Sequence, residues 1–69
     1  MKDNKFGKVL YELRVDKGIS QRKLGEDLGV VNQTISFWEN GKREPDMDTL
    51  IKIAKYFNVS LEYLFGYEI

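Results

Sequence analysis

The chain has 69 residues, of which 42% are hydrophobic and 32% charged, as expected for one ordinary globular domain. Eleven basic and eleven acidic side chains give a net charge of zero, which argues against binding nucleic acid through bulk positive charge alone. The absence of cysteine and histidine excludes disulfides, most zinc sites and an imidazole base. No apolar run reaches the length of a membrane-spanning helix, and the first residues lack the apolar core of a signal peptide. We therefore expect a cytoplasmic protein.

The first predicted helix covers residues 6–16. Phe6, Leu10 and Leu13 recur there at helical spacing and form an apolar stripe. Gly18 follows, in the position where glycine commonly ends a helix.

A second, shorter helix is expected to begin after the N-cap Ser20 and to end at Gly29. Leu24 and Leu28 are four residues apart, which places them on one face. Gly25 lies next to this pair, and its missing side chain would let another helix approach closely.

The third predicted helix covers residues 31–40 and stops at Gly41. Ile35 and Trp38 are three residues apart and indicate an inner face, so Trp38 is predicted to pack in the core rather than stack on bases. Two helices joined by such a tight turn form a helix-turn-helix unit, whose second helix can enter the DNA major groove. The outward face of residues 31–38 is therefore the candidate working surface.

A fourth helix is expected after the N-cap Asp46, with Lys52 and Lys55 solvated on its surface. Its predicted core stripe consists of Met47, Leu50, Ile51, Ala54 and Phe57.

A short last helix is expected between the N-cap Ser60 and Gly66. The predicted fold is therefore all-α: a compact bundle of five helices in one domain, residues 1–69, with its core in 6–66 and a short tail, 67–69.

A family pattern runs through all five predicted helices with constant spacing. It consists of Leu13-Arg14, Gly18-Ile19-Ser20-Gln21, Leu24, Leu28-Gly29-Val30, Thr34-Ile35-Ser36, Trp38-Glu39, Gly41-Lys42, Pro45, Leu50, Ile53-Ala54 and Val59-Ser60-Leu61. Over nearly the whole chain, this pattern closely resembles the Cro/repressor-type (lambda repressor-like) helix-turn-helix DNA-binding domains. The resemblance implies a regulator of transcription, a repressor in particular, that binds a palindromic operator in double-stranded DNA as a homodimer.

The resemblance also implies roles for single residues. Base reading falls on Asn32, Gln33 and Phe37, with Val31 and Ser36 beside them. Side-chain amides suit this role, because they match the donor and acceptor edge of adenine.

Phosphate contacts are expected at both ends of the helix-turn-helix unit. The resemblance places Ser20 and Gln21 against one phosphate and Asn40 and Lys42 near another, while Arg43 is a further candidate because it flanks the reading helix. Arg14 and Glu39 match a structural pair that joins the first and third helices.

Three residues depart from the family pattern. Val31 stands where the third helix usually has a polar cap, and its methyls could meet a thymine methyl instead. Glu26 would repel a phosphate if it faced one. Phe37 replaces a residue that is often polar, so its ring could contact DNA, fold back onto the core or bind a partner.

Dimer formation is suggested by an apolar C-terminal segment, with Leu61, Tyr63, Phe65, Tyr67 and Ile69. The alternative is that Leu61, Leu64 and Phe65 close the core of the monomer.

No catalytic pair, phosphate-binding glycine loop, metal site, cofactor site or small-molecule site is indicated, so an enzyme is not expected. An alternative function is a protein-interaction module with the same fold, such as an antitoxin-type partner.

Overall fold

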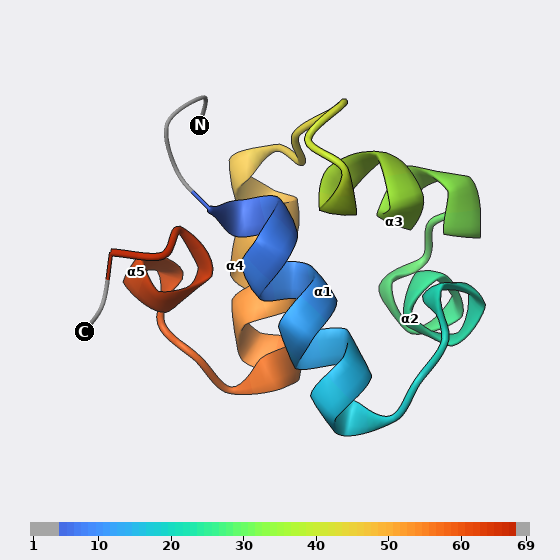
Figure 1. Cartoon of the computed structure of the whole chain (residues 1–69), viewed down its shortest axis with the longest axis horizontal. Coiled ribbons are helices and arrows are strands. Elements are labelled where there is room, and N and C mark those ends of the chain that lie inside the picture. The colour runs from blue at the N-terminus through green and yellow to red at the C-terminus, as the bar shows by residue number, and fades with distance from the viewer. Residues whose placement is uncertain (1–4, 68–69) are drawn as a thin grey trace.

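The computed structural model describes residues 5–67, which form five α-helices and no strand. They are α1 (Phe6–Lys17), α2 (Gln21–Leu28), α3 (Asn32–Glu39), α4 (Met47–Phe57) and α5 (Leu61–Leu64). Figure 1 shows α1 in the middle of the molecule, with α2 and α3 on one side and α5 on the other. The predicted all-α architecture is confirmed. No helix within residues 5–67 combines the length and the apolar character needed to span a bilayer.

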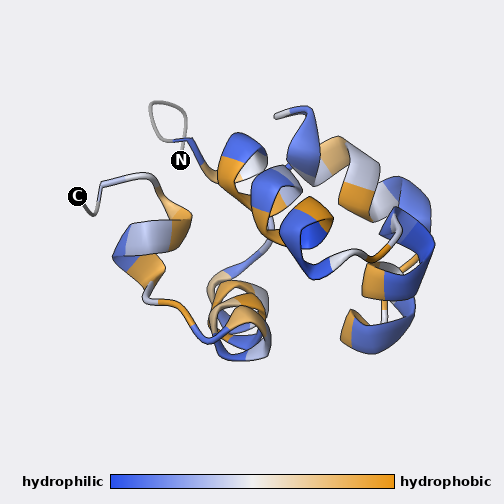
Figure 2. Cartoon of the chain, turned by 60° about the horizontal axis from the view of Figure 1, so that its bottom comes forward, coloured by the Kyte–Doolittle hydropathy of each residue, from blue (hydrophilic) through white to orange (hydrophobic). Residues whose placement is uncertain are grey.

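One hydrophobic core joins all five helices. Most helices carry hydrophilic and hydrophobic residues on different sides of the ribbon (Figure 2). The buried cluster consists of Phe6, Leu10, Leu24, Leu28, Ile35, Trp38, Leu50, Ile53, Ala54 and Leu64. The stripes predicted for the first three helices are therefore confirmed, with Leu13 partly buried against the cluster.

The stripe predicted for α4 was partly wrong. Met47 is 58% exposed and Ile51 is 37% exposed, whereas Ile53, which was not predicted in the stripe, is fully buried. The helix carries two overlapping apolar stripes, and a helix can turn only one of them inward. The stripe that starts at Leu50 and includes Ile53 is the one that packs on the core.

Side chains cap the starts of three helices. The side-chain oxygens of Ser20, Asp46 and Ser60 accept hydrogen bonds from the backbone N–H three residues later, as their sequence positions predicted. Lys52 differs from expectation, because its Nζ donates to the carbonyl oxygen of Leu28 at 2.8 Å and so satisfies the end of α2.

Each helix ends with the same pair of backbone hydrogen bonds, the Schellman pattern. In every case one N–H reaches back three residues and the next N–H reaches back five. The pairs are Gly18 and Ile19, Gly29 and Val30, Gly41 and Lys42, Asn58 and Val59, and Gly66 and Tyr67.

The C-terminal segment divides between core and surface. Leu64 is fully buried, and Leu61 and Phe65 pack partly buried against the core, so these three close the monomer. Tyr63 and Tyr67 are exposed. Ile69, the last residue of the proposed dimer segment, lies outside the described residues.

Candidate nucleic-acid interface

α3 presents two different faces. Ile35 is fully buried and Trp38 is 5% exposed, so they anchor the helix in the core. Asn32 and Gln33 are exposed on the surface. Within residues 5–67 no other segment covers these two amides, so the face that the sequence assigned to base reading is accessible there.

The turn between α2 and α3 packs closely against Gly25, which has no side chain to prevent the contact. A Cβ on Gly25 would lie 2.6 Å from the carbonyl oxygen of Val30 and 3.4 Å from the backbone nitrogen of Asn32. The close approach predicted at Gly25 is therefore present, and it is the backbone leading into α3 that approaches.

The opposite end of α3 packs against a second glycine, Gly7, which no local sequence pattern predicts. A Cβ on Gly7 would lie 2.7 Å from the carbonyl oxygens of both Trp38 and Glu39. The N-terminus of α1 thus packs directly on the backbone at the end of α3. Both ends of the candidate reading helix are fixed by close backbone contacts.

A polar network on Glu39, the last residue of α3, holds the same end of the helix. Arg14 donates from Nε to Glu39 Oε2 at 2.6 Å and from Nη2 to Oε1 at 3.2 Å. Its Nη1 donates to the carbonyl oxygen of Ile19 at 2.9 Å. Gln21 Nε2 adds a hydrogen bond of 3.0 Å to Glu39 Oε1. The predicted contact between Arg14 and Glu39 is confirmed, and it extends to α2.

The N-terminus of α3 lacks a capping side chain. Val31 is the N-cap residue, makes no side-chain cap hydrogen bond and is 65% exposed. Its methyl groups therefore lie at the surface beside Asn32, where a polar cap would otherwise turn back onto the helix.

The C-terminal end of α3 carries polar and cationic groups. Asn40 Nδ2 donates to the carbonyl oxygen of Ser36 at 2.9 Å and lies 3.3 Å from Ser36 Oγ, so these two predicted contact residues are partners. Lys42 and Arg43 follow and are both exposed. The Arg43 guanidinium carbon lies 5.6 Å from the centre of the Phe37 ring.

Phe37 does not fold back into the core. It is partly exposed and belongs neither to the buried cluster nor to the hydrophobic residues packed against it. Its ring instead lies beneath Arg43 on the surface.

Ion pairs neutralise the acidic residues of α2. Glu26 Oε2 lies 3.6 Å from Arg22 Nε, and Asp27 Oδ1 lies 3.1 Å from Lys23 Nζ. A hydrogen bond from the Tyr56 hydroxyl, followed by one from Lys23, lowers the pKa of Asp27 below its usual value of 3.8. The carboxylate of Glu26 is therefore not an isolated negative charge beside a phosphate site.

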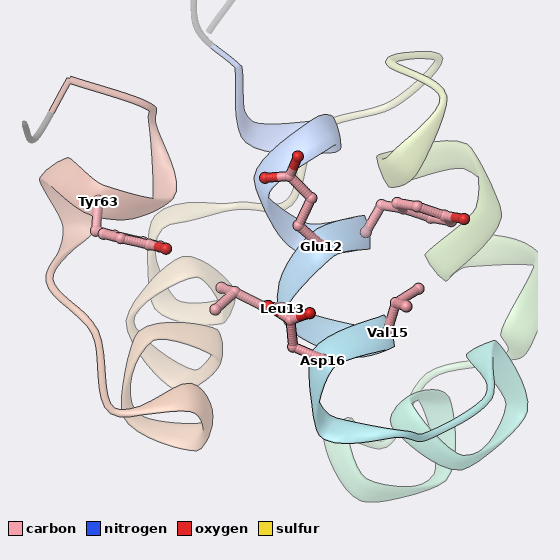
Figure 3. A pocket seen from close by; sticks show the side chains of 6 residues that line it. Glu12, Leu13, Val15, Asp16 and Tyr63 are labelled. Atoms are coloured by element: carbon pink, nitrogen blue, oxygen red, sulfur yellow. The ribbon is translucent and has the colours of Figure 1, made fainter.

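A groove between α1 and α5 is lined by acidic side chains, in contrast to the cationic end of α3. It has a volume of about 320 Å³ and is lined by Tyr11, Glu12, Leu13, Val15, Asp16 and Tyr63. Figure 3 shows Tyr63 reaching from α5 toward Leu13 of α1, with Glu12 and Asp16 on the α1 side. Two carboxylates at this groove disfavour phosphate, which leaves the α3 side as the candidate DNA surface. Among residues 5–67 no group of three or more acidic side chains could hold a metal ion.

Comparison with known proteins identifies this arrangement. A family model described as helix-turn-helix matches residues 10–64. The chain belongs to the helix-turn-helix family. The resemblance to repressor-type domains inferred from the sequence is therefore confirmed.

Named relatives of this helix-turn-helix protein are regulators of transcription. The HTH-type transcriptional regulator ImmR of Bacillus subtilis is 42% identical over 61 residues, which cover 88% of this chain and 48% of ImmR. The chain thus spans about half the length of that relative. YgzD of Bacillus subtilis, an uncharacterized HTH-type transcriptional regulator, is 42% identical over 57 residues, which cover 83% of this chain and 86% of YgzD.

A solved structure gives the same result for the fold. The P22 c2 repressor protein, crystallised in complex with the synthetic operator 9T, superposes with a TM-score of 0.84 at 32% identity. The match covers 91% of the helix-turn-helix chain and 96% of the repressor chain.

One predicted phosphate residue of this helix-turn-helix domain is already engaged. The amide of Gln21 donates one of its hydrogens to Glu39. An amide carries two N–H donors, so a second one remains for a ligand. Ser20 Oγ accepts from the backbone N–H of Lys23. The backbone N–H groups of Gln21 and Arg22, the first two residues of α2, have no carbonyl partner within the helix and are the other donors available to a phosphate at this end.

Proposed function

We propose that the chain is a sequence-specific DNA-binding regulator of transcription. α3 enters the major groove, where Asn32 and Gln33 read base edges, with Val31, Ser36 and Phe37 beside them. Phosphate contacts come from Ser20 and Gln21 at one end of the unit and from Asn40, Lys42 and Arg43 at the other.

The observation that carries this proposal is the division of α3 into an anchored and an exposed face. Ile35 and Trp38 are buried while Asn32 and Gln33 are exposed. A helix held at both ends presents its amides in one fixed orientation, which a reading helix needs.

The proposed assembly is a homodimer on a palindromic operator, and the proposed outcome is repression in the cytoplasm. The P22 c2 repressor was crystallised with an operator, which supports an operator as the ligand of this chain too. The proposed working unit is one domain comprising residues 1–69.

Selection of bound sites from a pool of random duplexes tests the proposal. We expect an enriched sequence with two inverted half-sites, because each subunit would read one of them. A pool that shows no enrichment would contradict sequence-specific binding.

A salt titration on random duplex DNA separates this function from a protein-interaction module. A protein that neutralises phosphates shows a steep linear fall of log affinity with log salt concentration, because condensed counterions are released. A nearly flat slope would favour the interaction module, which the zero net charge of the chain allows.

A further inference from the structure

The segment that leaves α3 is folded back onto Phe37. Gly41 has φ of +73°, and its N–H donates to the carbonyl oxygen of Trp38. The N–H groups of Lys42 and Arg43 both donate to the carbonyl oxygen of Phe37, at 2.9 and 3.4 Å. The backbone that bears the two cations is therefore tied to Phe37 itself.

The same helix ending carries different side chains elsewhere in the molecule. After α1, α2 and α4, the residue whose N–H donates to the carbonyl oxygen five positions earlier is Ile19, Val30 and Val59, respectively. Each of these side chains packs partly buried against the core. After α3 this residue is Lys42, which is exposed and is followed by Arg43. The end of α3 thus places cations at the surface where three other helices place core anchors.

Arg43 is held by the Phe37 ring. Its guanidinium carbon lies 5.6 Å from the ring centre, within the distance at which a cation is attracted to an aromatic face. Phe37 is also four residues after Gln33, so both lie on the same side of α3. The guanidinium therefore sits beyond the base-reading amide, toward the edge of a groove that α3 would occupy.

We propose that Phe37 is a positioning residue for Arg43, and that the pair forms a preset clamp for one DNA phosphate at the C-terminal end of α3. This inference rests on the DNA-binding function proposed above. The ring face limits the positions available to a long flexible side chain, and the guanidinium keeps N–H donors at its edge for a phosphate. Phe37 thus acts on affinity through Arg43 rather than through a base.

A double-mutant cycle on a selected duplex tests the coupling. Phe37→Leu keeps apolar bulk but removes the aromatic face, and Arg43→Ala removes the cation. We expect Phe37→Leu to weaken binding about 2–5-fold in the unchanged background and to have little effect once Arg43 is alanine. Phe37→Tyr keeps the ring, so in that background Arg43→Ala should weaken binding by the same factor as in the unchanged chain.

Lys42→Ala is the matched control, since it removes a neighbouring cation that lies over no ring. Its effect should add to that of Phe37→Leu. Fully additive losses for Phe37→Leu and Arg43→Ala would overturn the proposal and would indicate direct contact of the ring with a thymine methyl or a sugar.

Neutral methylphosphonate substitutions locate the phosphate without any change at Phe37. One substituted position near the end of each half-site should weaken the unchanged chain and leave Arg43→Ala unaffected. If no position behaves in this way, Arg43 does not clamp a phosphate.

The two proposals can fail separately. A flat salt dependence of binding by the unchanged chain would contradict the DNA-binding function itself. A steep salt dependence combined with additive affinity losses for Phe37→Leu and Arg43→Ala would contradict only the clamp. NMR of the unchanged chain without DNA adds a direct measurement, because Arg43 side-chain protons above a ring are shifted upfield. Absence of that shift would contradict the clamp even if Phe37→Leu failed to fold.

Discussion

Asn32 and Gln33 project from the first turn of α3 beside the methyl groups of Val31. An amide read against adenine gives two hydrogen bonds to one base edge, whereas an apolar side chain nearby favours a thymine methyl. This group of side chains therefore suits a half-site containing adenine and thymine.

The roles proposed for Gln33 and Lys42 predict different mutant behaviour. Gln33→Ala should weaken binding to the selected site by about 1–3 kcal/mol and relax the preference at one base pair. Lys42→Ala should weaken binding to all duplexes alike and reduce the salt slope by about one unit. Affinities for the selected and a scrambled duplex at several salt concentrations measure both effects. A uniform loss for both variants would contradict the assigned reading face.

A second prediction concerns Tyr56, whose hydroxyl donates to Asp27 Oδ2 and so links α4 to α2. This hydrogen bond, followed by burial, raises the pKa of Tyr56 from 10.0 to about 12. The folded chain holds the phenolic proton more tightly than the unfolded chain, so the stabilisation is complete below pH 10.0 and is lost as pH rises toward about 12.

Tyr56→Phe should therefore lower the free energy of unfolding near neutral pH by about 0.5–1.5 kcal/mol, and the difference should shrink at high pH. Urea unfolding of both chains across this pH range measures it. Tyr63→Phe is the control, because Tyr63 is exposed and its substitution should change stability little. A difference between Tyr56→Phe and the unchanged chain that does not vary with pH would contradict the titration of this hydrogen bond.

At the scale of elements, α3 is the helix whose placement is most constrained. Gly25 admits the backbone that enters it, Gly7 contacts the backbone that ends it, and Glu39 joins it to α1 and α2. An element that is fixed at both ends can hold its side chains in one orientation toward a ligand, which lowers the loss of freedom on binding.

For the two glycines, the sign of the change in stability on substitution by alanine tests whether the close contacts are rigid. Alanine in a helix interior is normally more stable than glycine by about 0.5–1 kcal/mol. Gly25→Ala and Gly7→Ala should instead destabilise by about 1–3 kcal/mol, because the new Cβ would meet backbone carbonyl oxygens. Thermal and urea unfolding measure the change. Unchanged or increased stability would show that the contacts relax easily.

These two glycines also show how far the sequence leads. Gly25 could be predicted because it stands beside Leu24 within the helix-turn-helix pattern, where local spacing indicates a close approach. Gly7 could not be predicted, because its contacts are the carbonyls of Trp38 and Glu39, which are remote in sequence. Only the packing of α1 on α3 reveals that position.

The sequence predicted part of the candidate site, namely the face of α3, but not the contact that forms after it. Helical periodicity was sufficient to separate the exposed amides Asn32 and Gln33 from the buried Ile35, because one stripe dominates α3. In α4 two stripes overlap, so periodicity alone placed Met47 in the core and missed Ile53. The position of Arg43 over Phe37 depends on the turn after α3 and leaves no periodic signal.

At the scale of the whole molecule, the distribution of charge matters more than its sum. The net charge is zero, yet Lys42 and Arg43 lie at the end of α3 while Glu12 and Asp16 line the groove at α1 and α5. This distribution attracts phosphate on one side and disfavours it on the other, so in the proposed complex it would orient the molecule on a duplex without a large net charge.

The proposed dimer has a surface available in Tyr63 and Tyr67, since Leu61 and Phe65 are already packed against the core. Two subunits related by a two-fold axis would place their α3 helices in successive major grooves, about 34 Å apart. Binding should therefore depend on the spacing of the two half-sites as well as on their sequence.

Spacing variants of the selected duplex test this geometry. Inserting about five base pairs, half a helical turn, between the half-sites should weaken binding strongly, because the second half-site then faces the opposite side of the duplex. Inserting a full turn restores the facing side but moves the half-sites too far apart for a compact pair of subunits, so binding should stay weak. Sedimentation with the unmodified duplex should give two chains per duplex. One chain per duplex, with affinity independent of spacing, would mean that each subunit acts alone and that Tyr63 and Tyr67 serve no symmetric contact on DNA.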